Sequence, residues 1–363
     1  MNGGERDVAE VVAQVYPAWI RAQKPYGLSD QEGQVKLNQN ESPFDLPLEL
    51  KREILERVLA EPWNRYPALR DAELHAEVAA YFGVRTEQLL IGPGSNSLLG
   101  ALAQSVAQPG AVVVAARPSF GLYASAARAS GNRLVEVGLG PDLRLDIAGM
   151  IAAAREHRAA LVFAANPNNP TGTAVPTEAL LELVAEVSGL VLVDEAYLEF
   201  SGLSSVLRAL DRHPNLIVLR TFSKAFGLAG VRCGCFLGHP EVLAPIDRLR
   251  APFALGPFVR HCIRAILRQP ELLRRTVEQI IQERERVLAR MSTIPGVVPR
   301  PSMSNFVLFE VLEHEKVYRR LHRLGITVRD VSGYDELKSS LRVTIGTPEE
   351  NEAFLNALAE AVK

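Results

Sequence analysis

The chain has 363 residues, of which 47% are hydrophobic and 23% are charged, a composition typical of soluble globular proteins. Its 40 basic and 42 acidic residues give a formal net charge of −2 without a run of like charge, which disfavours binding to nucleic acid or to a membrane surface. No stretch approaches the roughly 18 uninterrupted apolar residues of a transmembrane helix, so no membrane span is expected.

The middle of the chain alternates short apolar runs with segments of helical apolar spacing. The expected strands cover residues 111–116, 134–137, 160–164, 190–193, 216–219 and 233–237. The expected helices include residues 95–107, 121–129, 147–157 and 177–187. Because the strand sequences are continuously apolar, as in strands buried on both faces, this order predicts an α/β fold with a mostly parallel sheet between helices.

The C-terminal part has a different pattern. Residues 257–291 are expected to form one long or broken amphipathic helix, followed by a strand at 305–311, a helix at 315–324, a strand at 341–345 and a helix at 348–362. This order predicts a smaller α+β domain at 257–363, after a large domain at 47–256. Residues 1–46 contain several Pro and Gly, so we expect an arm that packs at the domain junction.

The cysteine and histidine patterns favour a cytoplasmic protein without a metal. Cys233, Cys235 and Cys262 make no disulfide framework and no CxxC pair, and the N-terminus opens with charged residues rather than an apolar signal. The seven histidines are scattered, and His314-Glu315 lacks the second histidine of an HExxH motif. We therefore expect no metal site and a reducing compartment.

Four polar, turn-rich segments follow expected strands, where ligands bind in parallel α/β sheets. They are GPGSNS at 92–97, NPNNPTG at 166–172, DEAY at 194–197 and TFSKAFGLAGVR at 221–232. The last contains Lys224, the one lysine between Lys51 and Lys316 in a chain with seven. A lysine can lose its proton and form a Schiff base, whereas arginine cannot, although scarcity alone can also arise by chance.

Two of the other segments suggest charge recognition. Asp194 directly follows a buried strand, where a carboxylate needs a partner: a protonated heterocyclic nitrogen, an arginine, or a helix N-terminus. GPGSNS leads into a helix and could cradle a phosphate, with Ser223 and Arg232 completing the site, or it could be a plain capped turn. It lacks the lysine of a P-loop and the spacing GxGxxG, which disfavours a nucleotide.

Taken together, these features fit pyridoxal 5′-phosphate (PLP). This cofactor requires an amine for its aldehyde, an acid for its ring nitrogen, a phosphate cup, donors to its ring hydroxyl and a stacking ring. Asn169 and Tyr197 are candidates for the hydroxyl, and Phe120 is the candidate for stacking on the ring.

The segments NPNNPTG, DEAYLEF and TFSKAFGLAGVRCG resemble those of the class I/II aminotransferases of PLP fold type I. More narrowly, the chain from about residue 24 to its C-terminus resembles the histidinol-phosphate aminotransferase subfamily. The blocks that carry this narrower resemblance are KPY at 24–26, LNQNESPF at 37–44, NRYP at 64–67, PSFGLY at 118–123, PSMSNFVLF at 301–309, GITVRD at 325–330 and LRVTIGTPEEN at 341–351.

The resemblance implies a role for each matching residue. Lys224 would bind the cofactor aldehyde and then move the proton, and Asp194 would keep the pyridine nitrogen protonated. The remaining cofactor contacts implied are Asn169 and Tyr197 at the ring oxygen, Phe120 on the ring face, and Gly94, Ser95, Ser223 and Arg232 at the phosphate. Asn96-Ser97 stands where the family commonly has an acidic pair, and Phe120 where tyrosine is frequent.

The resemblance also implies a homodimer with shared active sites, because Tyr66 matches a tyrosine that reaches the neighbouring subunit's cofactor phosphate. Arg342 matches the arginine that binds the substrate α-carboxylate and, with the tyrosine matching Tyr26, the phosphate of histidinol phosphate. The implied reaction is transamination of L-histidinol phosphate with 2-oxoglutarate in histidine biosynthesis. An aromatic amino acid aminotransferase, an amino-acid-phosphate decarboxylase and a binding protein without turnover are the alternatives.

Overall fold

The computed structural model describes residues 7–21 and 34–363. Residues 1–32 belong to a short N-terminal unit, and the second unit extends from Gly33 to the C-terminus. In the first unit, helices α1 (Val8–Val15) and α2 (Ala18–Arg21) are described, and Asp7 caps α1 by accepting a hydrogen bond from the amide of Ala9.

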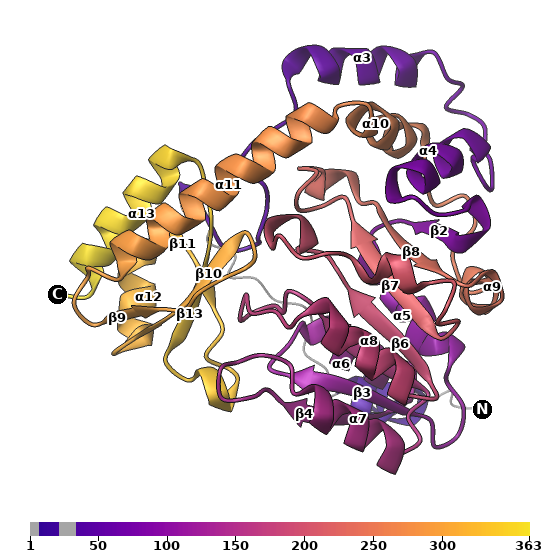
Figure 1. Cartoon of the computed structure of the whole chain (residues 1–363), viewed down its shortest axis with the longest axis horizontal. Coiled ribbons are helices and arrows are strands. Elements are labelled where there is room, and N and C mark those ends of the chain that lie inside the picture. The colour runs from indigo at the N-terminus through magenta and orange to yellow at the C-terminus, as the bar shows by residue number, and fades with distance from the viewer. Residues whose placement is uncertain (1–6, 22–33) are drawn as a thin grey trace. The chain divides into compact units, whose positions relative to one another are not determined.

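A seven-stranded sheet forms the centre of the second unit (Figure 1). Its strand order is β2-β8-β7-β6-β5-β3-β4, and β8 runs antiparallel to both of its neighbours while the other pairs are parallel. The strands are β2 (Leu89–Gly92), β3 (Val112–Arg117), β4 (Arg133–Gly138), β5 (Leu161–Ala165), β6 (Leu190–Asp194), β7 (Leu216–Thr221) and β8 (Gly234–Gly238). The prediction of a mostly parallel α/β sheet is therefore confirmed.

The sheet is buried on both faces, which explains its continuously apolar strands. Along β5, Val162 and Ala164 pack into one hydrophobic cluster, whereas Leu161, Phe163 and Ala165 pack into another. The second cluster includes residues of α5 (Ser95–Ser105), α6 (Gly121–Ala129) and α9 (Pro240–Asp247), and the first includes residues of α7 (Ile147–Glu156) and α8 (Thr177–Glu186). Alternate residues of a strand point to opposite faces, so helices cover the sheet from both sides.

Residues 257–291 form two helices, α10 (Pro257–Leu267) and α11 (Pro270–Met291). The helical pattern is interrupted between Leu267 and Pro270. Pro270 is the first residue of α11, and the fixed φ of proline suits a helix start. Of the two forms expected for this segment, the broken one is thus observed. Helix α10 packs against α3 (Leu48–Leu59) and α4 (Ala72–Phe82), and α11 extends from this region toward the C-terminal strands (Figure 1).

A four-stranded antiparallel sheet, in the order β12-β13-β10-β9, lies in the C-terminal part. Its strands are β9 (Val297–Pro299), β10 (Phe306–Val311), β12 (Arg329–Asp330) and β13 (Ser340–Thr344). Helices α12 (His314–Arg323) and α13 (Pro348–Ala361) pack against each other. The expected strands and helices of this part are confirmed to within a few residues.

The segment after Gly33 joins the C-terminal part through its backbone. Strand β1 (Val35–Lys36) pairs in parallel with β11 (Ile326–Thr327), and the amide of Thr344 donates to the carbonyl of Leu37. Residues 34–363 lie in one compact unit. The division into an arm at 1–46 and domains at 47–256 and 257–363 stays a prediction.

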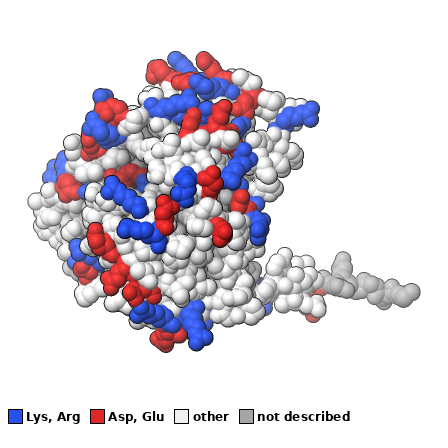
Figure 2. Space-filling view, turned by 45° about the vertical axis from the view of Figure 1, so that its right-hand side comes forward, with Lys and Arg blue, Asp and Glu red and all other residues white. Residues whose placement is uncertain are grey.

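Charged side chains of both signs are interspersed on the face shown in Figure 2. Within the described ranges, 7–21 and 34–363, none of the helices has the length and apolar character needed to span a bilayer. The three cysteines are buried thiols, and Cys235 lies inside β8 as expected for a strand thiol.

Candidate active site

The candidate residues gather where the parallel strands of the central sheet end. Asp194 is the last residue of β6, Asn169 lies in the loop after β5, and Lys224 lies in the loop after β7. Because these strands are parallel neighbours, their carboxyl ends share one edge of the sheet.

Asp194 is a buried carboxylate held by neutral groups. It is 6% exposed, and its oxygens accept hydrogen bonds from the hydroxyl of Tyr123 at 2.6 Å and from the amide of Ala196 at 2.9 Å. Burial raises the pKa of Asp194 to about 6, although both hydrogen bonds act to lower this pKa. A cation beside the carboxylate would therefore stabilise its charged form.

The next residue, Glu195, has a different environment. It is buried too, but it pairs with Arg220 at 3.0 Å and accepts hydrogen bonds from Ser205 and from the amide of Val206. Arg220 also pairs with Glu199. The charge of Glu195 is thus compensated within the chain, and no ion pair of this kind is found for Asp194 among the described residues.

The amine of Lys224 lies close to the segment that follows β1. Its Nζ donates to the carbonyl of Gln39 at 2.8 Å and lies 5.9 Å from the ring centroid of Tyr197. Burial lowers the pKa of Lys224 to about 7, and the positive charges of Arg342 and Arg232 lower this pKa further. A substantial fraction of the amine is therefore uncharged, and able to act as a nucleophile, at neutral pH.

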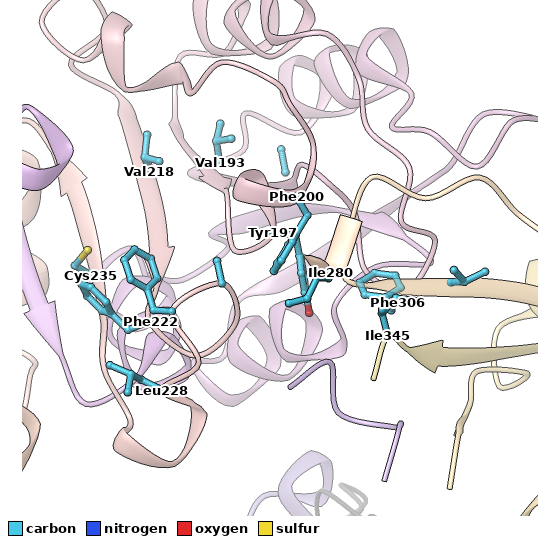
Figure 3. Packing of buried hydrophobic residues seen from close by; sticks show 14 of the residues in the cluster. Val193, Tyr197, Phe200, Val218, Phe222, Leu228, Cys235, Ile280, Phe306 and Ile345 are labelled. Carbon is cyan, nitrogen blue, oxygen red and sulfur yellow. The ribbon is translucent and has the colours of Figure 1, made fainter. Parts of the chain in front are cut away.

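Asn169, Tyr197 and Arg342 form one hydrogen-bonded group. Asn169 donates through Nδ2 to the Tyr197 oxygen at 3.3 Å, and its Oδ1 accepts from Arg342 Nη1 at 2.6 Å. Arg342, on β13, also donates to the carbonyl of Asn38 at 2.8 Å. Tyr197 packs edge-on against Phe306 of β10, so these residues join the central sheet to the C-terminal sheet (Figure 3).

The loop before α5 and the loop after Lys224 lie next to each other, where the sequence predicts a phosphate cup. Gly94 precedes α5 with φ +80°, and a Cβ placed on it would lie 2.8 Å from Arg232 Nη2. Arg232 Nη1 lies 3.5 Å from the hydroxyl of Ser223 and 2.9 Å from the carbonyl of Ala229. Ser95 opens α5, where unpaired backbone amides favour an anion.

The remaining candidates are less closely connected to this site. Phe120 is partly buried and directly precedes α6. Its ring packs edge-on against the ring of Tyr123, with 5.6 Å between the centroids, and Tyr123 in turn donates to Asp194. Tyr66 is 83% exposed and stacks on Phe253 at 4.8 Å, so within this chain the structure does not bring Tyr66 to Lys224. Tyr26 lies outside the described residues.

Sequence reasoning missed several residues that contact the site. Asn38 and Gln39 contribute carbonyl oxygens, Asn40 donates to the Tyr197 oxygen at 3.0 Å, and Tyr123 donates to Asp194. Asn38 to Asn40 lie within LNQNESPF, whose dense run of amides was the available signal. Sequence reasoning also did not single out Arg329, which lies opposite Arg342 in the β12–β13 pair.

Comparison with known proteins gives consistent matches over nearly the whole chain. Residues 32–358 match the family model described as aminotransferase class I and II. A histidinol-phosphate aminotransferase of Chlorobaculum tepidum is 40% identical over 328 residues, 90% of this chain and 94% of the relative. One of Thermococcus kodakarensis is 39% identical over 341 residues, 94% of this chain and 96% of the relative.

A solved structure agrees with this result. The histidinol-phosphate aminotransferase from Sinorhizobium meliloti in complex with pyridoxal-5′-phosphate has a TM-score of 0.88 and 26% identity, over 96% of this chain and 97% of that one. The chain therefore belongs to the class I and II aminotransferase family.

Proposed function

We propose that the protein transfers the amino group of L-histidinol phosphate to 2-oxoglutarate, giving imidazole acetol phosphate and L-glutamate, in histidine biosynthesis. The observation that carries the choice of substrate is the 40% identity with a histidinol-phosphate aminotransferase across 90% of the chain. The reaction type is supported by the site, in which a partly uncharged amine, a buried acid and an anion cup lie at one edge of the sheet.

The cofactor is PLP, and the residues present fit it. Asp194 is a buried carboxylate held by neutral donors, which suits a protonated ring nitrogen, and Arg232 is an exposed cation beside the backbone of Gly94. PLP, when bound, supplies an electron sink for the negative charge that develops at the carbon carrying the amino group. Gly94, Ser95, Ser223 and Arg232 would hold its phosphate, and Asn169, Tyr197 and Phe120 would contact its ring.

Lys224 would act as the acid and base of the reaction. An amine whose pKa lies near 7 can accept a proton at Nζ in one step and return it in the next without a large energetic cost in either direction. Asp194 would hold the ring-nitrogen proton in place throughout. Both side chains are positioned by neighbouring parallel strands, β6 and β7, which keeps their separation fixed.

Gly94→Ala is expected to weaken PLP binding by about tenfold or more. An alanine at φ +80° is strained, and its Cβ would push Arg232 Nη2 away from the cup, which removes a charge-assisted contact to phosphate. The measurement is titration of the cofactor-free protein with PLP. Gly131→Ala is the matched control, since Gly131 has φ +76° and no atom within 4 Å of its Cβ position; equal effects on PLP binding would contradict the prediction.

Substrate anions would bind at Arg342. Its guanidinium is buried, and its cross-strand partner Arg329 places a second positive charge on the same face of the β12–β13 pair. One site must accept the phosphate of one substrate and a carboxylate of the other, and arginine can bind either oxyanion through two parallel donors.

Arg342→Lys is expected to lower kcat/KM by about 10- to 100-fold for both histidinol phosphate and 2-oxoglutarate, because lysine keeps the charge but loses the planar pair of donors. Steady-state kinetics with each substrate varied in turn measures this loss. Arg300→Lys is the control, because Arg300 follows β9 at the other edge of the same sheet and forms an exposed ion pair with Glu310. A loss with one substrate alone would show that the two anions bind through different residues.

The proposed reaction is tested by adding single substrates to the purified PLP-loaded protein. Histidinol phosphate should convert the cofactor to its amino form, observed as a change of its visible absorption, and 2-oxoglutarate should reverse the change. Conversion by phenylalanine but not by histidinol phosphate would exclude the proposed substrate, and release of carbon dioxide from an amino acid phosphate would favour the decarboxylase.

The proposal includes two further parts: the protein is a homodimer with shared active sites, and it is located in the cytoplasm. The homodimer can be tested directly. The support for the homodimer is the exposure of large apolar side chains: Tyr66, Phe253, on which it stacks, and Trp63 and Leu69, which are near Tyr66 in the sequence. Exposed large apolar side chains are typical of a protein–protein interface when they adjoin one another. Sedimentation equilibrium should give twice the 39.7 kDa mass of one chain, and a monomer at micromolar concentration would contradict this part of the proposal.

A further inference from the structure

The hydroxyl of Tyr197 receives two hydrogen bonds at once. Its oxygen accepts from Asn40 Nδ2 at 3.0 Å and from Asn169 Nδ2 at 3.3 Å. A phenolic oxygen has two acceptor positions and one hydrogen. With both acceptor positions filled, the hydrogen must point in the remaining direction, so the direction of donation depends on how the two amides are oriented.

The orientation of Asn169 is determined by Arg342. The guanidinium can only donate, and its Nη1 lies 2.6 Å from Asn169 Oδ1, so this atom must be the carbonyl oxygen. The amide nitrogen of Asn169 therefore faces Tyr197. A flipped Asn169 would place two donors against each other.

Thr344 contacts both the backbone and the side chain of Asn40. The backbone amide of Asn40 donates to Thr344 Oγ1 at 2.9 Å, and the hydroxyl of Thr344 donates to Asn40 Oδ1 at 3.3 Å. In this arrangement Asn40 Nδ2 is the side-chain atom that faces Tyr197. The backbone carbonyl of Asn40 accepts a hydrogen bond from Asn305 Nδ2 at 3.1 Å. These bonds hold Asn40 at 1% exposure with φ +54°, a conformation that asparagine adopts more readily than most residues.

We propose that Asn40 is a positioning residue that, together with Asn169, makes Tyr197 an obligatory hydrogen-bond donor to the ring oxygen of the cofactor. This inference rests on the proposed function, which places PLP beside Asn169 and Lys224. Tyr197 packs edge-on against Phe306, with its oxygen at the tip of the ring (Figure 3). Asn40 determines where the hydrogen of that oxygen points, and it does so without touching the reacting atoms.

The test is Asn40→Asp, which keeps the size of the side chain and tolerates the positive φ but replaces the donor Nδ2 by an acceptor. The Tyr197 hydroxyl would then turn toward the new carboxylate and leave the cofactor oxygen without its donor. The measurement is a pH titration of the PLP-loaded protein, followed by the visible absorption of the cofactor. The midpoint pH of this titration should rise by about one unit, because the form with a negatively charged ring oxygen loses a hydrogen bond.

The same substitution in a Tyr197→Phe background separates this effect from the added charge. The carboxylate is still present there, but no hydroxyl can turn, so the midpoint should rise several-fold less than in the parent protein. Equal rises in both backgrounds would show that Asn40→Asp acts through charge alone and would overturn the inference.

A second variant covers the case in which Asn40→Asp does not fold. Asn40→Gly keeps the backbone conformation and deletes the amide, so one acceptor position of Tyr197 becomes empty and the midpoint should rise by a smaller amount. An unchanged midpoint in a folded Asn40→Gly protein would also overturn the inference. Absence of any PLP absorption in the parent protein would instead contradict the proposed function.

Discussion

Replacing Lys224 by alanine is expected to lower turnover by at least about 10³-fold, because the variant loses both the amine that binds the cofactor and the group that moves the proton. Lys224→Arg should be similarly inactive, since arginine keeps the positive charge but does not give up its proton near neutral pH. Single-turnover kinetics with histidinol phosphate and PLP-loaded protein measures both variants. Turnover near the parent rate in either variant would refute the assigned role.

The pH dependence of stability provides a second check on Lys224. The pKa of its amine is about 7 in the folded protein and 10.5 in a model peptide, so between these values the unfolded chain binds more protons than the folded one. The contribution of Lys224 to the unfolding free energy of the cofactor-free protein therefore rises as the pH rises from about 7 to 10.5. Denaturant unfolding should show that this rise is reduced in Lys224→Met.

Asp194→Asn is expected to change activity and stability in opposite directions. Activity should fall by about 10²–10³-fold, because a neutral amide cannot hold the ring nitrogen in its charged form. The cofactor-free protein should nevertheless become more stable above pH 6 by about 2 kcal/mol, because the variant no longer buries a carboxylate without a cation. Denaturant unfolding of cofactor-free parent and variant at pH 7 measures the gain.

The expected gain in stability follows from the pKa of Asp194, which is about 6 in the folded protein and 3.8 in a model peptide. Between these values the folded protein holds a proton that the unfolded chain has lost, so the contribution of Asp194 falls as the pH rises, by about 3 kcal/mol at most. Glu195→Gln is the control, since Glu195 pairs with Arg220 and its loss should destabilise the protein. Destabilisation by Asp194→Asn at pH 7 would contradict the prediction.

The central sheet could be predicted because its strands are buried on both faces, so each appears in the sequence as a continuous apolar run. Strand β2 was missed because it has only four residues, Leu89–Gly92, and pairs with β8 about 145 positions later in the chain. Short strands with distant partners leave little local signal, since the partner rather than the propensity of the segment determines the pairing.

Asn169, Asp194 and Lys224 could be predicted as candidates because each lies at the end of an apolar strand and differs in chemistry from its surroundings. Asn40 and Tyr123 could not, because their functional partners, Tyr197 and Asp194, lie 157 and 71 positions away. An asparagine in a polar run or a tyrosine on a helix acquires such a contact only in the folded chain. The roles of Tyr66 and Tyr26 stay predictions, and Tyr66 would act on a second chain.

The hydrogen bonds between residues 37–40 and strand β13 constrain when the enzyme can first work during synthesis. Asn40 and Thr344 are 304 positions apart, as are Asn38 and Arg342, so both ends of the chain must be present before these bonds form. When Lys224 has emerged from the ribosome, more than a hundred further residues must still emerge before β13 is available. The nascent protein thus remains without a complete active site until translation is nearly finished.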